Sequence, residues 1–367
     1  MQTNAGTRAV VACTAAVALT LGCGSRTGLD LWLDAGDTDP ALDARTEAAI
    51  DAGMDGPTMC VAAPAPRVFL SLDSPLPTGT GGGNAYALVG DATRLYTTAF
   101  AHDDAAEYVV LSIDPCTGAY TSFGSTTGRT PLTATSSGPF YQSPVRPSGQ
   151  TVTIDQAGPL GQSPHVVAPL GMDTLAILTI AAGRGYAIDE SLSSVVTLAL
   201  DGTAPTTLVP GGAWGDGLAV DDVYAYFYSA NGVARVPVTG GPMTKLFDAG
   251  GGTICGSGEP PDGANSLLLI DDQNIYLAVH SGLLRVAKDG SSSSTYDVAG
   301  MVPCSPIAQD DTFLYFWAES GLSRVAKQGG SPETLAAEND SPGGIVVTPT
   351  SIYWMLFTHS IMKLDKP

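Results

Sequence analysis

Paired aspartates that recur before a tyrosine are the first candidates for chemistry. The pairs and their tyrosines are Asp221-Asp222 with Tyr226, Asp271-Asp272 with Tyr276, and Asp310-Asp311 with Tyr315. Neighbouring carboxylates can serve as general acid and base. These pairs recur at a predicted turn between strands, so we interpret them as turn formers whose side chains cap backbone amides. The tyrosines are predicted to be buried core residues.

A second candidate group combines three histidines with a carboxylate. Each member follows one of the strands that carries a recurring tyrosine; the members are His280, Glu319, His359 and His102. Imidazole and carboxylate suit transition-metal ions or a polar ligand. These four are the candidate ligand-binding residues. No resident metal or cofactor is predicted, because loops of adjacent repeats can hold such side chains too far apart for coordination at about 2.0–2.2 Å.

Sequence motifs of known catalytic sites are missing. The chain contains no GxSxG, no HExxH and no Walker loop, and no cysteine and histidine stand in a recognisable catalytic context. The glycine-rich stretch Gly79–Gly83 opens no predicted helix, so we interpret it as a loop. The sequence therefore predicts no catalytic residue.

The tyrosines mark a repeat. Its clearest copy, Ser305–Leu335, predicts four short strands separated by turns rich in Asp, Ser and Gly. Successive tyrosines are separated by 45, 45, 40, 50, 39 and 38 residues; they are Tyr96, Tyr141, Tyr186, Tyr226, Tyr276, Tyr315 and Tyr353. Four strands in roughly 40–45 residues are typical of one β-propeller blade. We predict an all-β propeller of seven four-stranded antiparallel blades, with six or eight as alternatives.

Two copies of the repeat carry motifs of known propellers. Ile352-Tyr353-Trp354 and Leu314–Trp317 resemble the YWTD and NHL types of β-propeller repeat, and the chain is similar to divergent propellers of bacterial envelope lipoproteins. The resemblance covers roughly Arg67–Pro367 and implies a fold rather than a ligand. The Asp of the YWTD motif is absent, because Met355 and Ala318 follow the two tryptophans.

The resemblance also implies how the ring closes. Propellers of this kind commonly complete the terminal blade with a strand from the opposite end of the chain. The last repeat stops at Lys363–Pro367, before its fourth strand, and Arg67–Leu72 is an unassigned strand. We expect these two to pair, which would remove two exposed sheet edges.

Residues 1–23 are typical of an export signal. Arg8 precedes an apolar run, Ala9–Leu21, that is too short to span a bilayer. The run ends at Thr20-Leu21-Gly22-Cys23, which resembles a lipobox, so Cys23 is the predicted lipid attachment site. An ordinary cleaved signal peptide with an incidental cysteine is the alternative. With the anchor, the sequence predicts an envelope lipoprotein, most simply in the outer membrane of a Gram-negative bacterium.

Residues 24–60 are predicted to be a disordered acidic tether. Between Asp30 and Pro57, eight carboxylates oppose the single Arg45, and no apolar periodicity is present. Their mutual repulsion should extend the segment. The carboxylates of Asp34–Asp39 alternate as in a calcium loop, but the Gly and Glu of an EF-hand are missing. The propeller domain is assigned to residues 61–367.

Four cysteines remain in the exported chain, and no CxxC pair suggests a metal site. Cys255 and Cys304 both lie before the first strand of a repeat, in successive repeats, so we favour a bridge between them. A Cys60–Cys116 bridge would then join the closing strand to the first repeat. Four unpaired thiols are the alternative.

The net charge of the chain argues against two classes of binding partner. With 16 basic and 36 acidic residues, the formal net charge is −20. This acidity argues against binding nucleic acid or an anionic membrane surface. The favoured hypothesis is a monomeric, non-enzymatic binding or scaffold module at the cell envelope that uses its rim loops against a protein or glycan. The alternative is a hydrolase or lyase with its site in the central depression of the propeller, since fold alone does not separate the two.

Overall fold

The computed structural model describes residues 63–71, 87–90, 93–100, 107–127, 132–143, 153–159, 164–169, 175–189, 192–229, 232–248, 267–280, 282–338, 342–356 and 360–367. All of them belong to one compact unit, Gly53–Pro367. The predicted signal, Cys23 and the tether lie outside these residues. Within them, no helix is long and apolar enough to cross a membrane.

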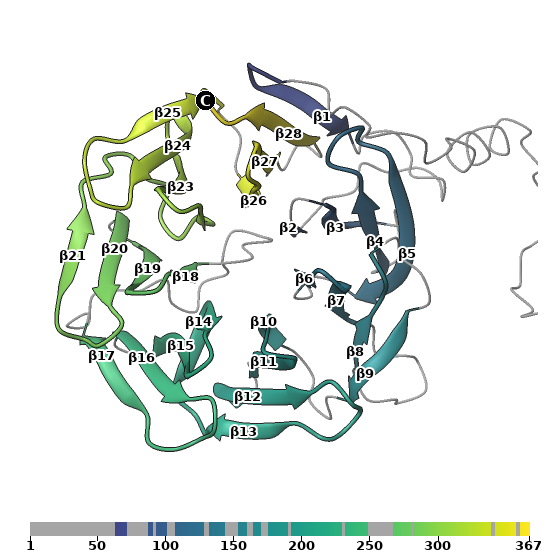
Figure 1. The fold of residues 1–367 in the computed structure, drawn as a ribbon, viewed down its shortest axis with the longest axis vertical. Coiled ribbons are helices and arrows are strands. Elements are labelled where there is room, and N and C mark those ends of the chain that lie inside the picture. Colours follow the sequence, from purple (N-terminus) through teal and green to yellow (C-terminus); the bar gives the residue numbers. More distant parts are fainter. Residues whose placement is uncertain are drawn as a thin grey trace, which may run out of the picture. The chain divides into compact units, whose positions relative to one another are not determined.

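The described residues form seven four-stranded antiparallel sheets arranged in a ring (Figure 1). Blade 1 contains β2 (Leu88–Gly90), β3 (Leu95–Phe100), β4 (Glu107–Ile113) and β5 (Tyr120–Thr127). Blade 2 contains β6 (Leu132–Thr135), β7 (Gly138–Gln142), β8 (Thr153–Gln156) and β9 (His165–Pro169). Blade 3 contains β10 (Leu175–Ala181), β11 (Arg184–Asp189), β12 (Ser194–Ala199) and β13 (Thr206–Val209).

The second half of the ring repeats this order. Blade 4 contains β14 (Ala213–Val220), β15 (Tyr224–Ser229), β16 (Gly232–Pro237) and β17 (Thr244–Asp248). Blade 5 contains β18 (Leu268–Ile270), β19 (Asn274–Val279), β20 (Gly282–Ala287) and β21 (Ser293–Tyr296). Blade 6 contains β22 (Ala308–Gln309), β23 (Phe313–Ala318), β24 (Gly321–Ala326) and β25 (Glu333–Ala336). Blade 7 contains β26 (Pro342–Val347), β27 (Ser351–Leu356), β28 (Ser360–Asp365) and β1 (Arg67–Ser71).

Blade 7 is closed by the strand from the N-terminal side of the domain, as predicted. β1 pairs antiparallel with β28, from Arg67 opposite Lys363 to Ser71 opposite Ser360. Beyond the strand, the Asp365 amide donates to the Ala63 carbonyl at 2.8 Å, and the Ala63 amide donates to the Asp365 carboxylate at 2.5 Å. The facing edges of β1 and β28 are therefore paired with each other, which removes two exposed strand edges.

The seven tyrosines that mark the repeat occupy one equivalent position. Each lies on the second strand of its blade and is at most 3% exposed. Each faces one residue of the third strand; in chain order these are Ser112, Asp155, Thr197, Arg235, Arg285, Arg324 and Lys363. Tyr226, Tyr276 and Tyr315 each precede the facing arginine by nine residues, so this spacing is the length of one hairpin. The equivalence includes blades 1–3, whose flanking sequences are divergent.

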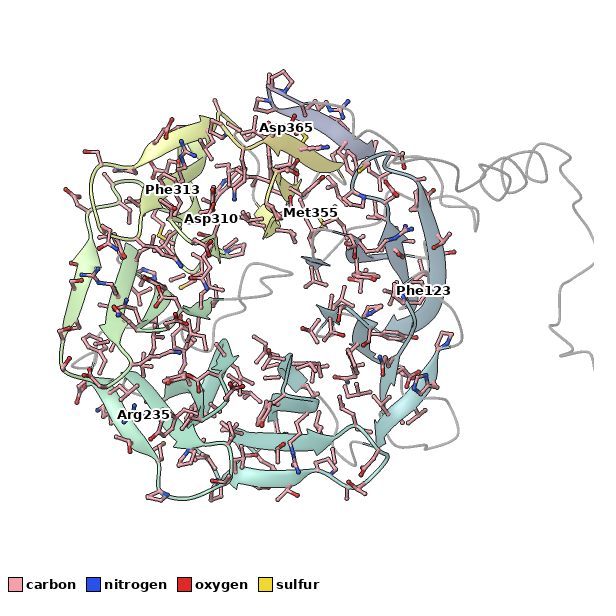
Figure 2. The ribbon with its side chains drawn as sticks, viewed as in Figure 1. Phe123, Arg235, Asp310, Phe313, Met355 and Asp365 are labelled. Carbon is pink, nitrogen blue, oxygen red and sulfur yellow. The ribbon has the colours of Figure 1, made fainter. Side chains whose placement is uncertain are left out.

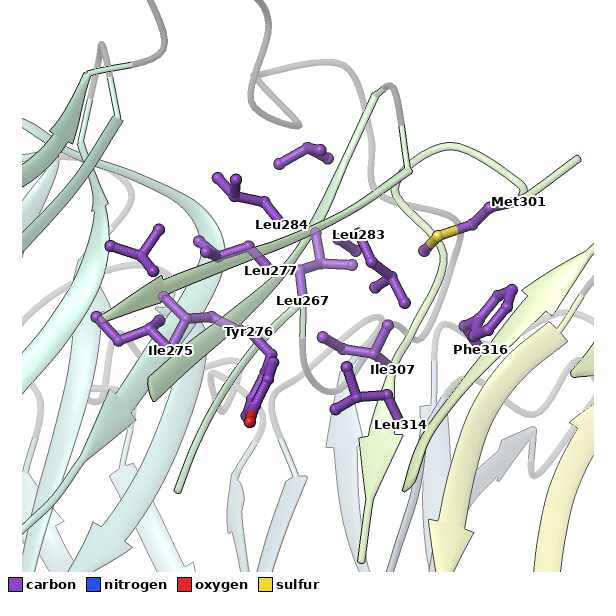
Figure 3. Close-up of a cluster of buried hydrophobic side chains, with 14 of the residues drawn as sticks. Leu267, Ile275, Tyr276, Leu277, Leu283, Leu284, Met301, Ile307, Leu314 and Phe316 are labelled. Carbon is purple, nitrogen blue, oxygen red and sulfur yellow. The ribbon is translucent and has the colours of Figure 1, made fainter. Parts of the chain in front are cut away.

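The core lies between the facing surfaces of adjacent blades. Between blades 5 and 6, Leu277 of β19 is buried in one cluster with Leu314 and Phe316 of β23 (Figure 3). Ile307 and Met301 from the connection between these blades complete the cluster. Burial of each such side chain stabilises the fold by about 1.5–3 kcal/mol. A blade thus needs its neighbour to cover its apolar surface.

The antiparallel order of each blade divides its turns between two faces of the ring. The turns between strands one and two and between strands three and four lie at one end, which we call the turn face. The turn between strands two and three lies at the other end together with the connection to the next blade, and we call this the connection face. The candidate His and Glu residues that the structure describes lie on the connection face, and the paired aspartates lie on the turn face.

Candidate functional site

The connection face carries the histidine and glutamate candidates that the structure describes. His280 follows β19 and Glu319 follows β23, so they occupy equivalent turns of blades 5 and 6, and both are exposed. His102 and His359 fall in the corresponding loops after β3 and β27, outside the described residues. The prediction that four equivalent loops carry these candidates can therefore be followed for two of them.

The position of Glu319 is fixed by the connection that leads into blade 6. The Glu319 amide donates to the Gly300 carbonyl at 2.7 Å, and the Val302 amide donates to the Trp317 carbonyl at 2.9 Å. Met301 forms an isolated bridge with Ala318. A Cβ at Gly300 would lie 3.7 Å from a carboxylate oxygen of Glu319, so this side chain passes over the connection. The connection thus extends the sheet and presents Glu319 from a defined backbone.

The chemistry open to His280 and Glu319 is recognition of a polar partner through a hydrogen bond or an ion pair. Among the residues that the structure describes, no three His, Cys, Asp or Glu side chains gather closely enough to hold a metal ion. The proposed set of four depends on His102 and His359, so it stays a prediction.

The cysteines are distributed between the two faces. Cys304 lies on the connection face, in the segment before β22, as predicted. Cys116 lies on the turn face between β4 and β5, where its amide donates to the Asp114 carboxylate at 2.8 Å. Cys60 and Cys255 lie outside the described residues. The Cys60–Cys116 and Cys255–Cys304 bridges stay predictions.

On the turn face, the first aspartate of each pair caps the turn that follows it, which confirms that prediction. One carboxylate oxygen of Asp221 accepts the amides of Val223 and Tyr224 at 2.9 and 2.8 Å. Asp271 and Asp310 accept the equivalent amides, at 2.9 and 2.8 Å and at 2.8 and 2.7 Å. The second aspartates, Asp222, Asp272 and Asp311, are exposed.

The second carboxylate oxygen of each turn-capping aspartate contacts the neighbouring blade, a contact that the sequence did not predict. In blade 4 it accepts the Tyr226 hydroxyl at 3.0 Å and lies 2.8 Å from Lys288 Nζ of blade 5. Asp271 likewise meets Tyr276 at 2.7 Å and Lys327 of blade 6 at 3.6 Å. Asp310, labelled in Figure 2, meets Tyr315 at 2.8 Å and Lys366 of blade 7 at 2.6 Å. We call each Asp–Tyr–Lys set an interblade latch.

The latches shift the acidity of their members. Burial alone would raise the pKa of Asp221, but hydrogen bonds from Lys288 and from the turn amides hold it at about 2. Asp310 has the same opposing causes and a pKa of about 2, and the pKa of Asp271 is also lowered. Burial and the adjacent carboxylate raise the pKa of the latch tyrosines. Strongly perturbed groups often mark an active site, but here their partners are structural.

The latch lysines do have a signal in the sequence. Each follows by three the basic residue opposite the core tyrosine, as in Arg285–Lys288 and Arg324–Lys327, both of which read RVAK, and in Lys363–Lys366. In blade 4 this position is Val238. A comparison of repeats alone shows the lysine, but its partner is in the preceding blade.

At two other seams of the ring, side-chain hydroxyls donate to backbone carbonyls at the same place. The Tyr353 hydroxyl of blade 7 donates to the Pro115 carbonyl of blade 1 at 2.6 Å. The Tyr96 hydroxyl of blade 1 donates to the Pro159 carbonyl of blade 2 at 3.2 Å, and Ser112 donates to the same carbonyl at 2.8 Å. In blades 7 and 1 the core tyrosine thus donates to a carbonyl of the next blade, whereas in blades 4–6 it donates to the aspartate of its own blade, which meets a lysine of the next blade.

Comparison with known proteins identifies the fold alone. No family model matches the chain, and no curated protein matches its sequence. Virginiamycin B lyase from Staphylococcus aureus is similar in structure, with a TM-score of 0.57 and 14% identity over 82% of this chain and 99% of the lyase. BamB from Moraxella catarrhalis has a TM-score of 0.50 and 12% identity over 83% of this chain and 99% of BamB. PorZ of Porphyromonas gingivalis has a TM-score of 0.53 and 14% identity over 82% of this chain and 39% of PorZ. These neighbours are β-propellers, as is this chain.

Proposed function

We propose that the chain is a non-enzymatic binding or scaffold module of the cell envelope. Its connection face is the recognition surface, and the partner is an envelope protein or a glycan. The proposal is carried by the structural role of the ionisable groups whose pKa is most strongly shifted. The aspartates with a pKa near 2 and their tyrosines hold adjacent blades together on the opposite face.

A ring whose blades are held together by these contacts is suited to binding a partner. Binding is stronger when the interacting loops are already held in their bound positions, because less conformational freedom is lost. Glu319 is presented by a hydrogen-bonded connection, and the latches restrain the far ends of the same blades. The connection face thus combines exposed polar side chains with a firm support.

Attachment to the envelope is the second part of the proposal. The predicted lipid on Cys23 would hold the chain at a membrane, and the acidic segment to residue 60 would separate the propeller from it. PorZ, which shares the propeller fold, is a bacterial surface component of the type-IX secretion system. A surface role for one propeller of this architecture supports the same setting here. Incorporation of labelled palmitate that is lost on Cys23→Ala tests the anchor.

The recognition face is tested with two charge reversals in one blade. Glu319→Arg changes the connection face of blade 6 and Asp311→Arg changes the turn face, both at exposed positions. Each variant, fused to a capture tag, is incubated with an envelope extract of the bacterium that makes it, and bound material is quantified. We expect Glu319→Arg to lose at least tenfold of the partner captured by the wild type and Asp311→Arg to keep it. Equal capture by both variants, or turnover of a polysaccharide or ester panel without any partner, would overturn the proposal.

A further inference from the structure

A cavity whose lining residues are mostly of polar types opens at the outer edge of the ring between blades 5 and 6. Its volume is about 270 Å³, and it lies between β21 and the turn that follows β24. Arg285, Ser294, Thr295, Tyr296 and Asp297 form the blade 5 side. Gly329 and Gly330 contribute to the blade 6 side. The cavity lies beside the outer strand of blade 5, and its blade 6 wall is a turn of the turn face.

The blade 5 wall of the cavity lacks a β-bulge that the other six blades have in their described strands. In those blades, the pairing of the third and fourth strands skips one residue of the outer strand. In blade 4 the skipped residue is Leu246, and in blade 7 it is Phe69. In blade 5 the register runs without a break from Leu283 opposite Tyr296 to Val286 opposite Ser293.

The bulge residue fills the space beside the next blade. Leu246 lies 3.5 Å from where a Cβ of Gly290 would stand, in the turn of blade 5 that follows β20. The Phe69 ring lies 3.7 Å from the corresponding point at Gly118 of blade 1. At Gly329, the equivalent glycine of blade 6, nothing lies within 4 Å of such a Cβ, as is also true of Gly240 and Gly202, whose preceding blades keep the bulge. The open space beside Arg285 is therefore identified by the cavity itself, and the missing bulge is one feature of its blade 5 wall.

Arg285 lines this space and forms no ion pair with a described residue, although the Asp297 carboxylate belongs to the same lining. The equivalent Arg235 lies 4.3 Å above the Tyr224 ring. Arg324 lies 4.3 Å above the Phe313 ring and pairs with Glu333 at 2.8 Å. In blade 5, Asn274 replaces the aromatic residue and Ser294 replaces the glutamate.

The remaining contacts of Arg285 hold it in place without neutralising it. One terminal nitrogen donates to the Lys327 carbonyl at 3.2 Å, and Tyr296 donates to the same carbonyl at 2.8 Å. Arg285 makes no ion pair with a described residue, and its side chain is half-buried. A partly desolvated guanidinium with free donors is suited to a planar carboxylate, which it can bind through two hydrogen bonds.

The other walls favour a ligand that carries hydroxyl groups. Ser294, Thr295 and Asp297 are exposed and offer hydroxyl and carboxylate oxygens, and the half-buried Tyr296 offers a ring beside a polar surface. The Asp297 carboxylate disfavours a phosphate with its two negative charges. We propose that this cavity binds a sugar acid, with its carboxylate on Arg285 and its hydroxyls on Asp297 and the Ser294–Thr295 edge. The proposal is independent of the connection face.

The test introduces a carboxylate opposite Arg285 by mutation. Ser294→Glu recreates in blade 5 the arrangement of Arg324 and Glu333, so the new carboxylate occupies the guanidinium. Thr244→Glu is the matched control, because Thr244 faces Arg235 in blade 4 and the added charge is the same. Glucuronate and galacturonate are titrated into the full chain by calorimetry, with glucose as the neutral probe.

We expect the wild type and Thr244→Glu to bind a uronate with equal affinity and Ser294→Glu to bind it at least tenfold more weakly. Glucose should bind more weakly than either uronate. Arg285→Gln, checked for an unchanged unfolding temperature, should lose the uronate as well. Absence of uronate binding to the wild type, equal binding by Ser294→Glu, or preference for glucose or a free amino acid would overturn the proposal.

Discussion

Two arcs of the same ring fasten their blades by different means. From blade 4 to blade 7, three seams have an aspartate and a tyrosine that meet a lysine of the next blade. From blade 7 through blade 1 to blade 2, the tyrosine hydroxyl donates to a backbone carbonyl of the next blade. The core position of the tyrosine is the same in all seven blades.

The comparison of the two arcs shows which contact of the buried tyrosine the fold requires and which contacts are additional. A buried tyrosine ring needs an acceptor for its hydroxyl, and either a carbonyl or a carboxylate meets that need. The lysine and the carboxylate add an ion pair whose strength depends on pH and on salt. We therefore expect the charged arc to respond to acid and the neutral arc to depend on closure by β1 and on the predicted Cys60–Cys116 bridge.

Removal of β1 should have the largest effect. A chain that begins at residue 72 leaves the β28 edge unpaired and loses Phe69, which contacts Tyr353 at a centroid separation of 5.4 Å. We expect a loss of at least about 4 kcal/mol from the free energy of unfolding, because both buried side chains and strand hydrogen bonds disappear. The control is a chain that begins at Gly53, and both are compared by urea unfolding. Equal stability of the two chains would show that β1 does not close the ring.

The predicted bridges should come next in size. Each would close a loop of roughly 50–60 residues, for which chain entropy predicts about 4 kcal/mol. Cys116 adjoins Pro115, whose carbonyl accepts Tyr353, so the Cys60–Cys116 bridge would reinforce a neutral seam. We expect non-reducing peptide mapping to recover both bridges, and Cys116→Ser and Cys304→Ser to unfold at lower temperature. Recovery of all four as alkylated thiols would remove the prediction.

Loss of a single latch should lower the free energy of unfolding less than loss of a disulfide bridge. Asp310→Asn keeps a turn-capping oxygen but loses the charge that pairs with Lys366, whose side chain is 18% exposed. We expect a loss of about 2 kcal/mol in the free energy of unfolding. Asp311→Asn removes the same charge from the neighbouring exposed residue and should change stability by less than about 0.5 kcal/mol. Equal effects of the two variants would mean that the latch does not stabilise the seam.

The contribution of this latch should disappear in acid. The folded-state pKa of Asp310 is about 2, below its ordinary value of 3.8, so the carboxylate stabilises the fold fully above the ordinary value. The stabilisation is lost as the pH falls through about 2. The difference between wild type and Asp310→Asn should therefore shrink from about 2 kcal/mol at pH 6 towards zero near pH 2. A difference that is constant with pH would contradict the ion pair.

The sequence predicted the ring because its main determinant is local. Tyr96, Tyr141 and Tyr186 mark equivalent strands although the residues around them diverge, since each must fill the same space between blades. The closing strand was also predictable, from a strand without a partner. The partners of the latch lysines and the cavity were not, because both depend on contacts with a neighbouring blade. The blade 5 wall of the cavity has one residue fewer after Ser294 than blade 4 has after Thr244, and this difference can be recognised only once the strand register is known.

The smallest effect distinguishes the two kinds of seam most directly. Tyr353→Phe removes a hydrogen bond to a carbonyl, and Tyr276→Phe removes one to the Asp271 carboxylate, from rings that are both at most 2% exposed. We expect each to lower the free energy of unfolding by about 1 kcal/mol at pH 6. Acid should leave the cost of Tyr353→Phe unchanged, because the Pro115 carbonyl does not titrate. It should reduce the cost of Tyr276→Phe, because the lowered pKa of Asp271 depends in part on this hydroxyl. Parallel pH dependence of the two variants would show that the arcs are fastened alike, since only a titrating acceptor can make the tyrosine contact sensitive to acid.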